Sequence, residues 1–143
     1  MPSFEEILNK KASAIEPPKA YPVGTYHCLI DGPGRPEKRG KNQTDVIIFR
    51  CKILSAQEDV DAQEAATQQI VGKYIDYQMW VTEKTEFMCK DFLENTLGIE
   101  PADKTLSEMI SEAPGKQLFI KLAHRASDDG KRVFHQVDST AHV

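Results

Sequence analysis

A short stretch in the first third of the chain combines the residue types that contact phosphate groups. Residues 32–44, GPGRPEKRGKNQT, carry three glycines, two prolines and the basic side chains Arg35, Lys38, Arg39 and Lys41. They do not fit a P-loop, because five residues rather than four separate the two glycines that would frame it, and no hydroxyl residue follows the lysine. A β-rich segment follows in place of the helix whose N-terminus would hold phosphate. The stretch is therefore predicted to be a loop between two strands.

Two aromatic residues supply the second chemical ingredient. Residues 71–82 alternate as a strand does, with Ile75, Met79 and Val81 on one face and Tyr74 and Trp80 on the other. If the first set points to the core, the two rings point outward, where nucleic-acid bases can stack on them for about 1–3 kcal/mol each. The alternative, that another segment covers this face and makes Trp80 a core residue, stays open from the sequence.

Other chemistry is sparse in this sequence. The four histidines show no metal-binding spacing, and the three cysteines, Cys28, Cys51 and Cys89, form no CxxC pair. Paired carboxylates lie in predicted loops without a histidine or lysine partner, and no serine or cysteine is set in a nucleophile motif. We therefore expect no catalytic residue, no metal site and no cofactor.

Composition indicates one ordinary domain of 143 residues, of which 40% are apolar. The sequence has no apolar run long enough to span a membrane and no signal-peptide pattern, so we expect a cytoplasmic protein without a membrane partner. The formal net charge is −4, but residues 56–69 and 91–116 carry −8 between them, which leaves +4 for the remainder. A local basic surface is therefore compatible with the acidic total.

The expected elements are five strands with a helix between the third and the fourth. Alternation and turn residues place the strands at 25–31, 44–54, 71–82, 116–125 and 131–138, with a polar excursion at 57–69. Helices are expected from residue 83 to about 97, with an apolar stripe that includes Phe87, Met88 and Phe92, and from 105 to about 113. This order is that of the OB-fold, a five-stranded Greek-key barrel that binds oligonucleotides through strands 2 and 3 and through the loops after strands 1 and 4.

The N-terminal segment is predicted to stand apart from this barrel. A capping box of Ser3 and Glu6 begins an amphipathic helix that extends to about residue 15, and the prolines of residues 16–24 form a linker. The chain is thus divided into residues 1–23, helix and linker, and residues 24–143, the OB-fold domain. The helix is expected to dock either on its own barrel or on a neighbouring subunit.

In the OB scheme both binding loops have clustered bases in or beside them, since the stretch at 32–44 is the loop after strand 1, and the loop after strand 4 is the turn that follows Arg125 and precedes Lys131 and Arg132. Strand residues add further bases near them. The candidate nucleic-acid contacts are Arg35, Lys38, Arg39, Lys41, Arg50, Lys52, Lys73, Tyr74, Trp80, Lys121, Arg125, Lys131 and Arg132.

At this level the chain resembles the small single-stranded-DNA-binding proteins encoded by bacteriophages and prophages, which are built on an OB-fold. The resemblance rests on GTYHCLI, the basic loop before TDVIIFRCKI, and VGKYIDYQMWV before EFMCKDFLENTLGI, and covers residues 24–98 and more loosely the last hairpin. It differs at the C-terminus, where many such proteins have an acidic tail and this chain ends VDSTAHV.

The resemblance implies non-catalytic, sequence-tolerant binding of single-stranded DNA in replication, recombination or repair. It leaves open whether replication or recombination proteins, or further copies of the chain, are also partners. The alternative from another class is a structural or adaptor protein that uses the barrel and the N-terminal helix for protein contacts, while a small hydrolase or nuclease lacks a visible cluster of acids.

Overall fold

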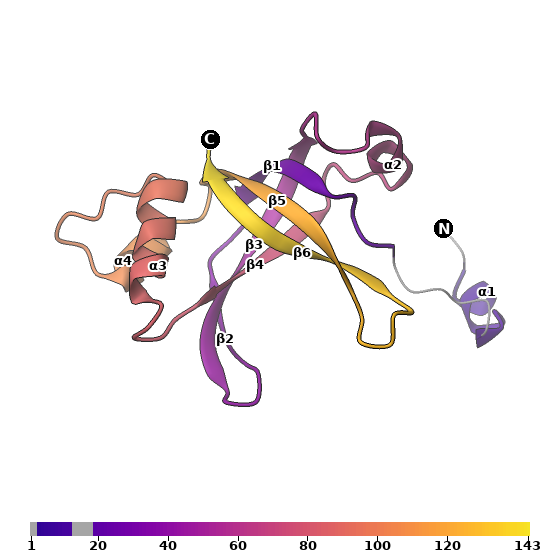
Figure 1. Cartoon of the computed structure of the whole chain (residues 1–143), viewed down its shortest axis with the longest axis horizontal. Coiled ribbons are helices and arrows are strands. Elements are labelled where there is room, and N and C mark those ends of the chain that lie inside the picture. The colour runs from indigo at the N-terminus through magenta and orange to yellow at the C-terminus, as the bar shows by residue number, and fades with distance from the viewer. Residues whose placement is uncertain (1–2, 13–18) are drawn as a thin grey trace.

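Six antiparallel strands form one strongly coiled sheet in the computed structural model, which describes residues 3–12 and 19–143 (Figure 1). The strand order is β2-β3-β1-β5-β6, and β4 pairs with the free side of β3. The bounds are β1 (Gly24–Ile30), β2 (Arg35–Arg39), β3 (Thr44–Ala56), β4 (Tyr74–Trp80), β5 (Gln117–Ala126) and β6 (Val133–His142).

The prediction of five strands with a simple loop at residues 32–44 is wrong, because residues 35–39 form a sixth strand, β2. It pairs with the first residues of β3, from Arg35 opposite Ile48 to Arg39 opposite Thr44, and so makes a hairpin. The pairing is possible because β3 is 13 residues long, while its ladder with β1 begins only at Cys51. Pro36 is tolerated because β2 is an edge strand.

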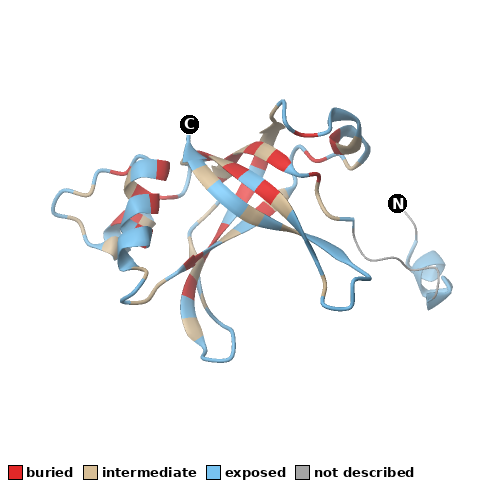
Figure 2. Cartoon of the chain, viewed as in Figure 1, coloured by how far each residue is buried: buried red, intermediate tan, exposed pale blue. Residues whose placement is uncertain are grey.

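The core lies on the inner face of the coiled sheet, where alternate residues are buried (Figure 2). In β1 the burial pattern alternates without exception, and Tyr26, Cys28 and Ile30 are completely or almost completely buried. In β4 the predicted inward residues Ile75 and Met79 are buried, which confirms the strand parity derived from the sequence.

Strands β4 and β6, like β2, are edge strands of this sheet. β4 pairs only with β3 and β6 only with β5, so the barrel-like sheet stays open between them. Both edge strands are completely described, and no ladder joins them. The opening leaves a groove lined by residues of both strands.

The helical segments close the ends of the sheet. α2 (Ala62–Thr67), capped by Asp61, lies at one end, within the polar excursion predicted at residues 57–69. At the other end lie α3 (Glu86–Asp91), the π-helix η2 (Phe92–Thr96) and α4 (Leu106–Ser111) (Figure 1). Thr105 caps α4 by accepting a hydrogen bond from the backbone N–H of Glu108, 3.1 Å away.

The apolar stripe expected on the first of these helices is partly wrong. Phe92 is buried, but Phe87 is 72% exposed and Met88 is 67% exposed. The buried stripe begins one residue later than Met88, with Cys89, Phe92 and the following Leu93, at the spacing of one helix face. Phe87 and Met88 therefore point away from the core.

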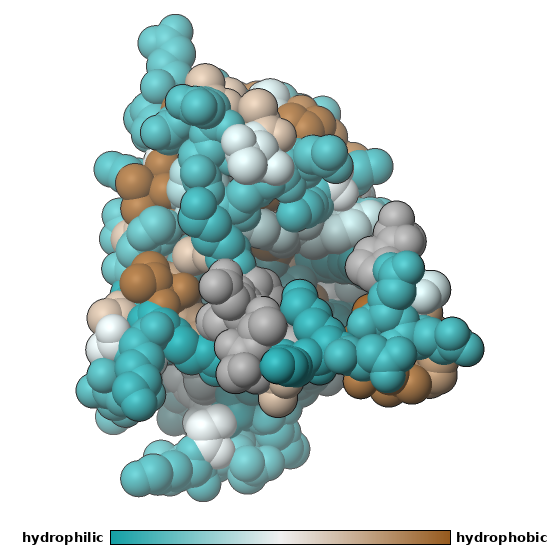
Figure 3. All heavy atoms as spheres, turned by 90° about the vertical axis from the view of Figure 1, so that its right-hand side faces the viewer, coloured by the Kyte–Doolittle hydropathy of each residue, from teal (hydrophilic) through white to brown (hydrophobic). Residues whose placement is uncertain are grey.

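The N-terminal helix α1 (Phe4–Leu8) is shorter than expected. Its capping box is present as predicted, with Glu6 N donating to Ser3 Oγ and Ser3 N donating to Glu6 Oε2. The helix ends at Leu8, and the later part of the predicted helix and linker, residues 13–18, lies outside the described residues. α1 buries no residue, and the view from its side shows a mostly hydrophilic surface with separate hydrophobic areas (Figure 3).

Candidate nucleic-acid interface

A groove follows the opening between β4 and β6, and we call it the seam groove. It has two adjoining parts with volumes of about 690 and 670 Å³, which share Asp76, His135, Gln136 and Val137. Its floor includes the apolar side chains Ile75 and Leu122. Five of the thirteen candidate contacts line it: Arg35, Arg50 and Tyr74 in the first part, and Trp80 and Arg125 in the second.

Arg50 and Tyr74 form a stacked pair in the first part of the groove. The Arg50 guanidinium carbon lies 3.7 Å from the centre of the Tyr74 ring. Strand register explains the contact, because Arg50 and Lys52 project from the same face of β3 and lie opposite Asp76 and Tyr74 on β4. Tyr74 is half-buried, so this pair offers a cation and a ring on one rigid strand surface.

Trp80 is exposed at the other end of β4, which answers the question that the sequence left open. Its exposed fraction is 41%, and it lies opposite Val46 of β3. Its backbone carbonyl accepts hydrogen bonds from Thr85 Oγ1 at 2.6 Å and from Cys89 Sγ at 3.1 Å. These bonds tie the strand end to α3, so the ring stands on a fixed backbone.

The bases of the β2–β3 hairpin are mostly paired with carboxylates within the chain. Lys38 lies 2.8 Å from Asp45 Oδ1, and Arg39 lies 2.6 Å from Glu37 Oε2. Arg35 is 3.9 Å from an oxygen of Asp76. Such exposed pairs are worth about 0–1 kcal/mol, so a phosphate can compete for these cations.

The hairpin does not present its bases on one face. Successive strand residues point to opposite sides, so Lys38 projects from the opposite face to Arg35 and Arg39. Lys41 lies in the turn and has no ion-pair partner within residues 3–12 and 19–143. None of Lys38, Arg39 and Lys41 lines the seam groove.

The β5–β6 hairpin carries the second basic loop. Its turn is held by Asp129 Oδ1, which accepts from Ser127 Oγ and from the backbone N–H of Lys131. The hydrogen bond from Ser127, followed by that from Lys131, lowers the pKa of the Asp129 carboxyl. The guanidinium of Arg132 lies 5.9 Å from the Phe134 ring. The tips of both hairpins point to the same side of the molecule (Figure 1).

Three further candidate contacts do not line the groove. Lys52 is exposed on β3, and Lys73 precedes β4 with its ammonium 6.0 Å from the centre of the Tyr21 ring. Lys121 is exposed on the outer face of β5, opposite Thr25 of β1. None of these three lysines lines the seam groove, although Lys52 lies two residues from Arg50 on the same face of β3.

Sequence reasoning missed the contact between Tyr21 and His135, of which His135 lines the groove. Their rings stack at 4.2 Å between centres with 10° between planes, and Tyr21 N donates to His135 Nδ1 at 3.0 Å. The Tyr21 hydroxyl donates to the carbonyl of Tyr74 at 3.3 Å. Burial, and then the neighbouring His124, lower the pKa of His135. No local pattern could have indicated a pair that is 114 residues apart.

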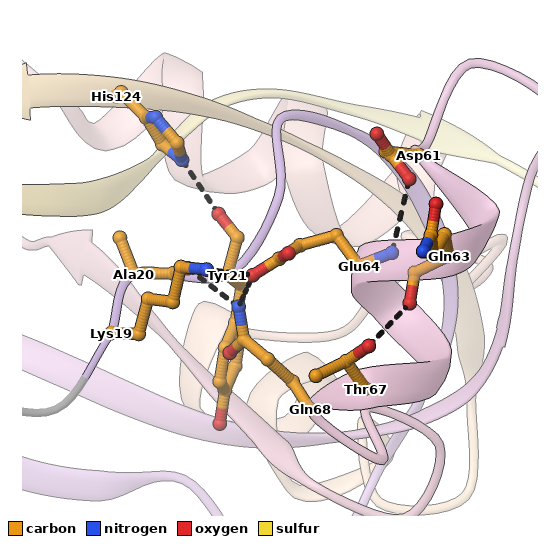
Figure 4. Close-up of polar contacts among 9 residues, drawn as sticks. All are labelled: Lys19, Ala20, Tyr21, Asp61, Gln63, Glu64, Thr67, Gln68 and His124. Carbon is orange, nitrogen blue, oxygen red and sulfur yellow. Dashed lines mark hydrogen bonds and ion pairs between the residues drawn. The ribbon is translucent and has the colours of Figure 1, made fainter.

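Residues 19–21 are held against the sheet and α2 rather than hanging as a free linker (Figure 4). Lys19 Nζ lies 2.6 Å from Glu64 Oε1, and Gln68 Nε2 donates to the carbonyl of Ala20 at 3.1 Å. His124 Nε2 lies 2.7 Å from the carbonyl oxygen of Tyr21 and acts as the donor there. The described end of the linker thus has a fixed place beside the seam groove.

Other chemical groups are isolated from one another. In the part of the chain that the structure describes, no three His, Cys, Asp or Glu residues come together as a metal site. All three cysteines are buried and free, and burial raises the pKa of Cys28 to about 12. Within the described residues, no helix is long and apolar enough to cross a membrane.

Comparison with protein families and with curated proteins gave no match. No protein-family model matches the sequence, and no curated protein sequence matches it significantly. Function must therefore be argued from the seam groove itself.

Proposed function

We propose that this protein binds single-stranded DNA non-catalytically and without strong sequence preference, in the seam groove between β4 and β6. The observation that carries the proposal is the line of Tyr74, stacked under Arg50, and exposed Trp80 along one strand, with Arg125 across the groove. Rings that stack on bases and arginines that contact phosphates are the two components of single-strand binding sites.

The fold supports the proposal through its pairing pattern. Without β2, the strands pair as β4-β3-β1-β5-β6, with helices between β4 and β5. We assign this arrangement to the OB-fold, with β3 and β4 as its binding strands. In this assignment Arg50, Tyr74 and Trp80 lie on the two strands that OB-folds use for oligonucleotides, and the two hairpins are its binding loops.

The charges of the groove predict that base stacking contributes more to the affinity for single-stranded DNA than electrostatic attraction does. Its arginines, Arg35, Arg50 and Arg125, are matched by three aspartates, Asp31, Asp76 and Asp138. Three phosphate contacts correspond to a salt slope of about −2 for a single strand, which is modest. The hairpin cations Lys41, Lys131 and Arg132 add to the slope only if the strand extends past the groove.

Sequence tolerance follows from this balance, since every base has a stacking face and phosphate contacts carry no sequence information. Such a protein would protect or present single strands in replication, recombination or repair in the cytoplasm, as the resemblance to phage and prophage proteins implies. A second candidate function, as an adaptor for proteins, is favoured by one observation: the large apolar residues of α1 are exposed.

The proposal is tested by the fluorescence anisotropy of a labelled oligo-dT strand titrated with wild-type protein and with Arg50→Ala and Arg125→Ala. Each substitution should weaken binding and reduce the salt slope by about 0.7, because each removes one phosphate contact. Lys104→Ala is the matched control, because Lys104 is paired with Glu112 beside α4 and lies outside the groove. Groove variants that bind like this control would contradict the proposal.

A further inference from the structure

α1 presents an uncovered apolar stripe. Phe4, Ile7 and Leu8 are all exposed, with Phe4 at 77%, and their i, i+3, i+4 spacing places them on one side of the helix. The helix is locally well specified, because its capping box is complete. A formed helix with its apolar side uncovered by any described residue is suited to a contact outside its own fold.

A second apolar surface lies between the end of β4 and α3, and we call it the helix-side pocket. It has a volume of about 380 Å³. Its wall combines the buried ring of Phe92 with the exposed side chains Phe87, Met88 and Trp80. Trp80 also borders the seam groove, but Phe87 and Met88 do not.

The charges around these two apolar surfaces are complementary only after the helix. Glu5 and Glu6 lie in the first turn of α1, on the side away from its apolar stripe, and Lys10 and Lys11 follow its C-cap Asn9. Around the helix-side pocket, Lys90 is paired with Glu94 at 3.6 Å. The other charged residues from 83 to 91 are three carboxylates, Glu83, Glu86 and Asp91, and one lysine. We call α1 together with Lys10 and Lys11 the arm, and Glu83, Glu86 and Asp91 the acidic rim of the pocket. If the apolar stripe of the arm lies in the pocket, its lysines can lie near the acidic rim.

The anchor of the arm determines which copy supplies it. Residues 19–21 are fixed on α2 and on the strands of the open seam through Glu64, Gln68 and His124. α1 lies beyond α2, at the opposite end of the molecule from α3 (Figure 1). α1 thus does not lie against the helix-side pocket of its own chain.

We propose that α1 of one copy docks in the helix-side pocket of a second copy, so that the chain self-associates by arm exchange. Phe4, Ile7 and Leu8 fill the pocket against Phe87 and Met88, while the lysines after the helix meet the acidic rim. The contact is heterologous, which means that the donor and acceptor surfaces differ, and two copies can satisfy each other's arm and pocket.

The test is the mass in solution, measured by light scattering across a dilution series without DNA. Wild type is expected at twice the chain mass of 16.1 kDa, and Phe4→Glu and Phe87→Glu are each expected at 16.1 kDa. Both sites are exposed, and glutamate is favourable in a first helical turn, so both variants keep the fold. Val71→Glu, at another exposed apolar residue, is the control and should keep the wild-type mass.

Mixing the two variants identifies the contact itself. Phe4→Glu retains an intact pocket and Phe87→Glu retains an intact arm, so an equimolar mixture should recover species of twice the chain mass, held by one good contact. A wild-type mass of 16.1 kDa at all concentrations, or variants that keep the doubled mass, would overturn the proposal. A mixture that stays at 16.1 kDa would also overturn it, because the arm would not be meeting the pocket.

Discussion

Replacing Trp80 by alanine should lower both the free energy of unfolding and the affinity for single-stranded DNA, and the exposure of the side chain allows both losses to be estimated. The side chain is 41% exposed, so it is neither a free surface ring nor a core residue. With about 250 Å² for a whole tryptophan, about 150 Å² is covered, which at about 25 cal/mol per Å² gives an upper bound near 4 kcal/mol. Allowing for a compact unfolded state lowers the expected loss of stability to about 2–3 kcal/mol.

The affinity loss should come from the stacked base. One base–ring stack is worth about 1–3 kcal/mol, which corresponds to a weakening of about 5- to 150-fold. In wild type, oligo-dT should quench the fluorescence of the single tryptophan in step with binding. The alanine variant should be followed by the anisotropy of a labelled strand, at a temperature where its melting curve shows it folded.

The control for this prediction is Phe119→Ala. Phe119 is a half-buried aromatic residue on the outer face of β5, packed against His27 and outside the seam groove. It should lose stability without losing affinity. A folded Trp80→Ala protein that binds oligo-dT as tightly as wild type, with no quenching in wild type, would refute the stacking role.

Three further predictions concern the rest of the chain. Because the pKa of His135 is lowered in the folded state, the unfolded state binds the proton more tightly. The free energy of unfolding should therefore be unaffected above about pH 6.5 and fall as the pH drops below it. Chemical denaturation from pH 8 to 5 measures this dependence, and a His135→Phe protein with the same pH dependence as wild type would contradict it. The thiols of Cys28 and Cys51, whose pKa values burial raises, should not react with a thiol reagent at pH 8 until the protein is unfolded, and rapid labelling of the native protein would be evidence against their burial. Gly34→Ala should destabilise the protein by about 1–3 kcal/mol, because the added Cβ would lie 2.6 Å from Ile47 Cγ2 and 2.9 Å from Phe49 Cε1. Val23→Ala, at an exposed residue, is the control. A Gly34→Ala protein that melts at the same temperature as the Val23→Ala protein would contradict this packing.

Strand parity was predictable from the sequence because a half-buried strand has a period of two. The alternation at residues 71–82 gave the correct inward residues in β4 and the correct outward position of Trp80. The same rule places Phe49 and Cys51 on the buried face of β3 and Arg50 on its exposed face. These predictions depend only on local chain geometry, which tertiary contacts did not override.

The hairpin strand β2 was not predicted because its residues are charged and include a proline, both unusual in strands. A local turn signal was present in Gly40 and Asn42, and Gly40 adopts positive φ in the structure, but Gln43, which also has positive φ, gave no such signal. The ion pairs that occupy Lys38 and Arg39 depend on the register of that hairpin, so the sequence suggested free cations where the structure has pairs.

The seam groove could not be derived from the sequence because it depends on how far the sheet coils before its edges meet. The number and order of strands leave open whether β4 and β6 pair, and here they do not. The stack of Tyr21 on His135 is equally nonlocal. The site therefore contains five predicted residues in an arrangement that only the folded sheet defines.

The most direct test of the account is equilibrium binding of a labelled oligo-dT strand to the wild-type protein over a range of salt concentrations. The groove predicts binding that persists at moderate salt through stacking, with log K falling against log salt at a slope near −2. A steeper slope would indicate additional contacts from the hairpin cations. Absence of binding at low salt, where every electrostatic contact is strongest, would contradict the claim that the seam groove is a single-strand binding site.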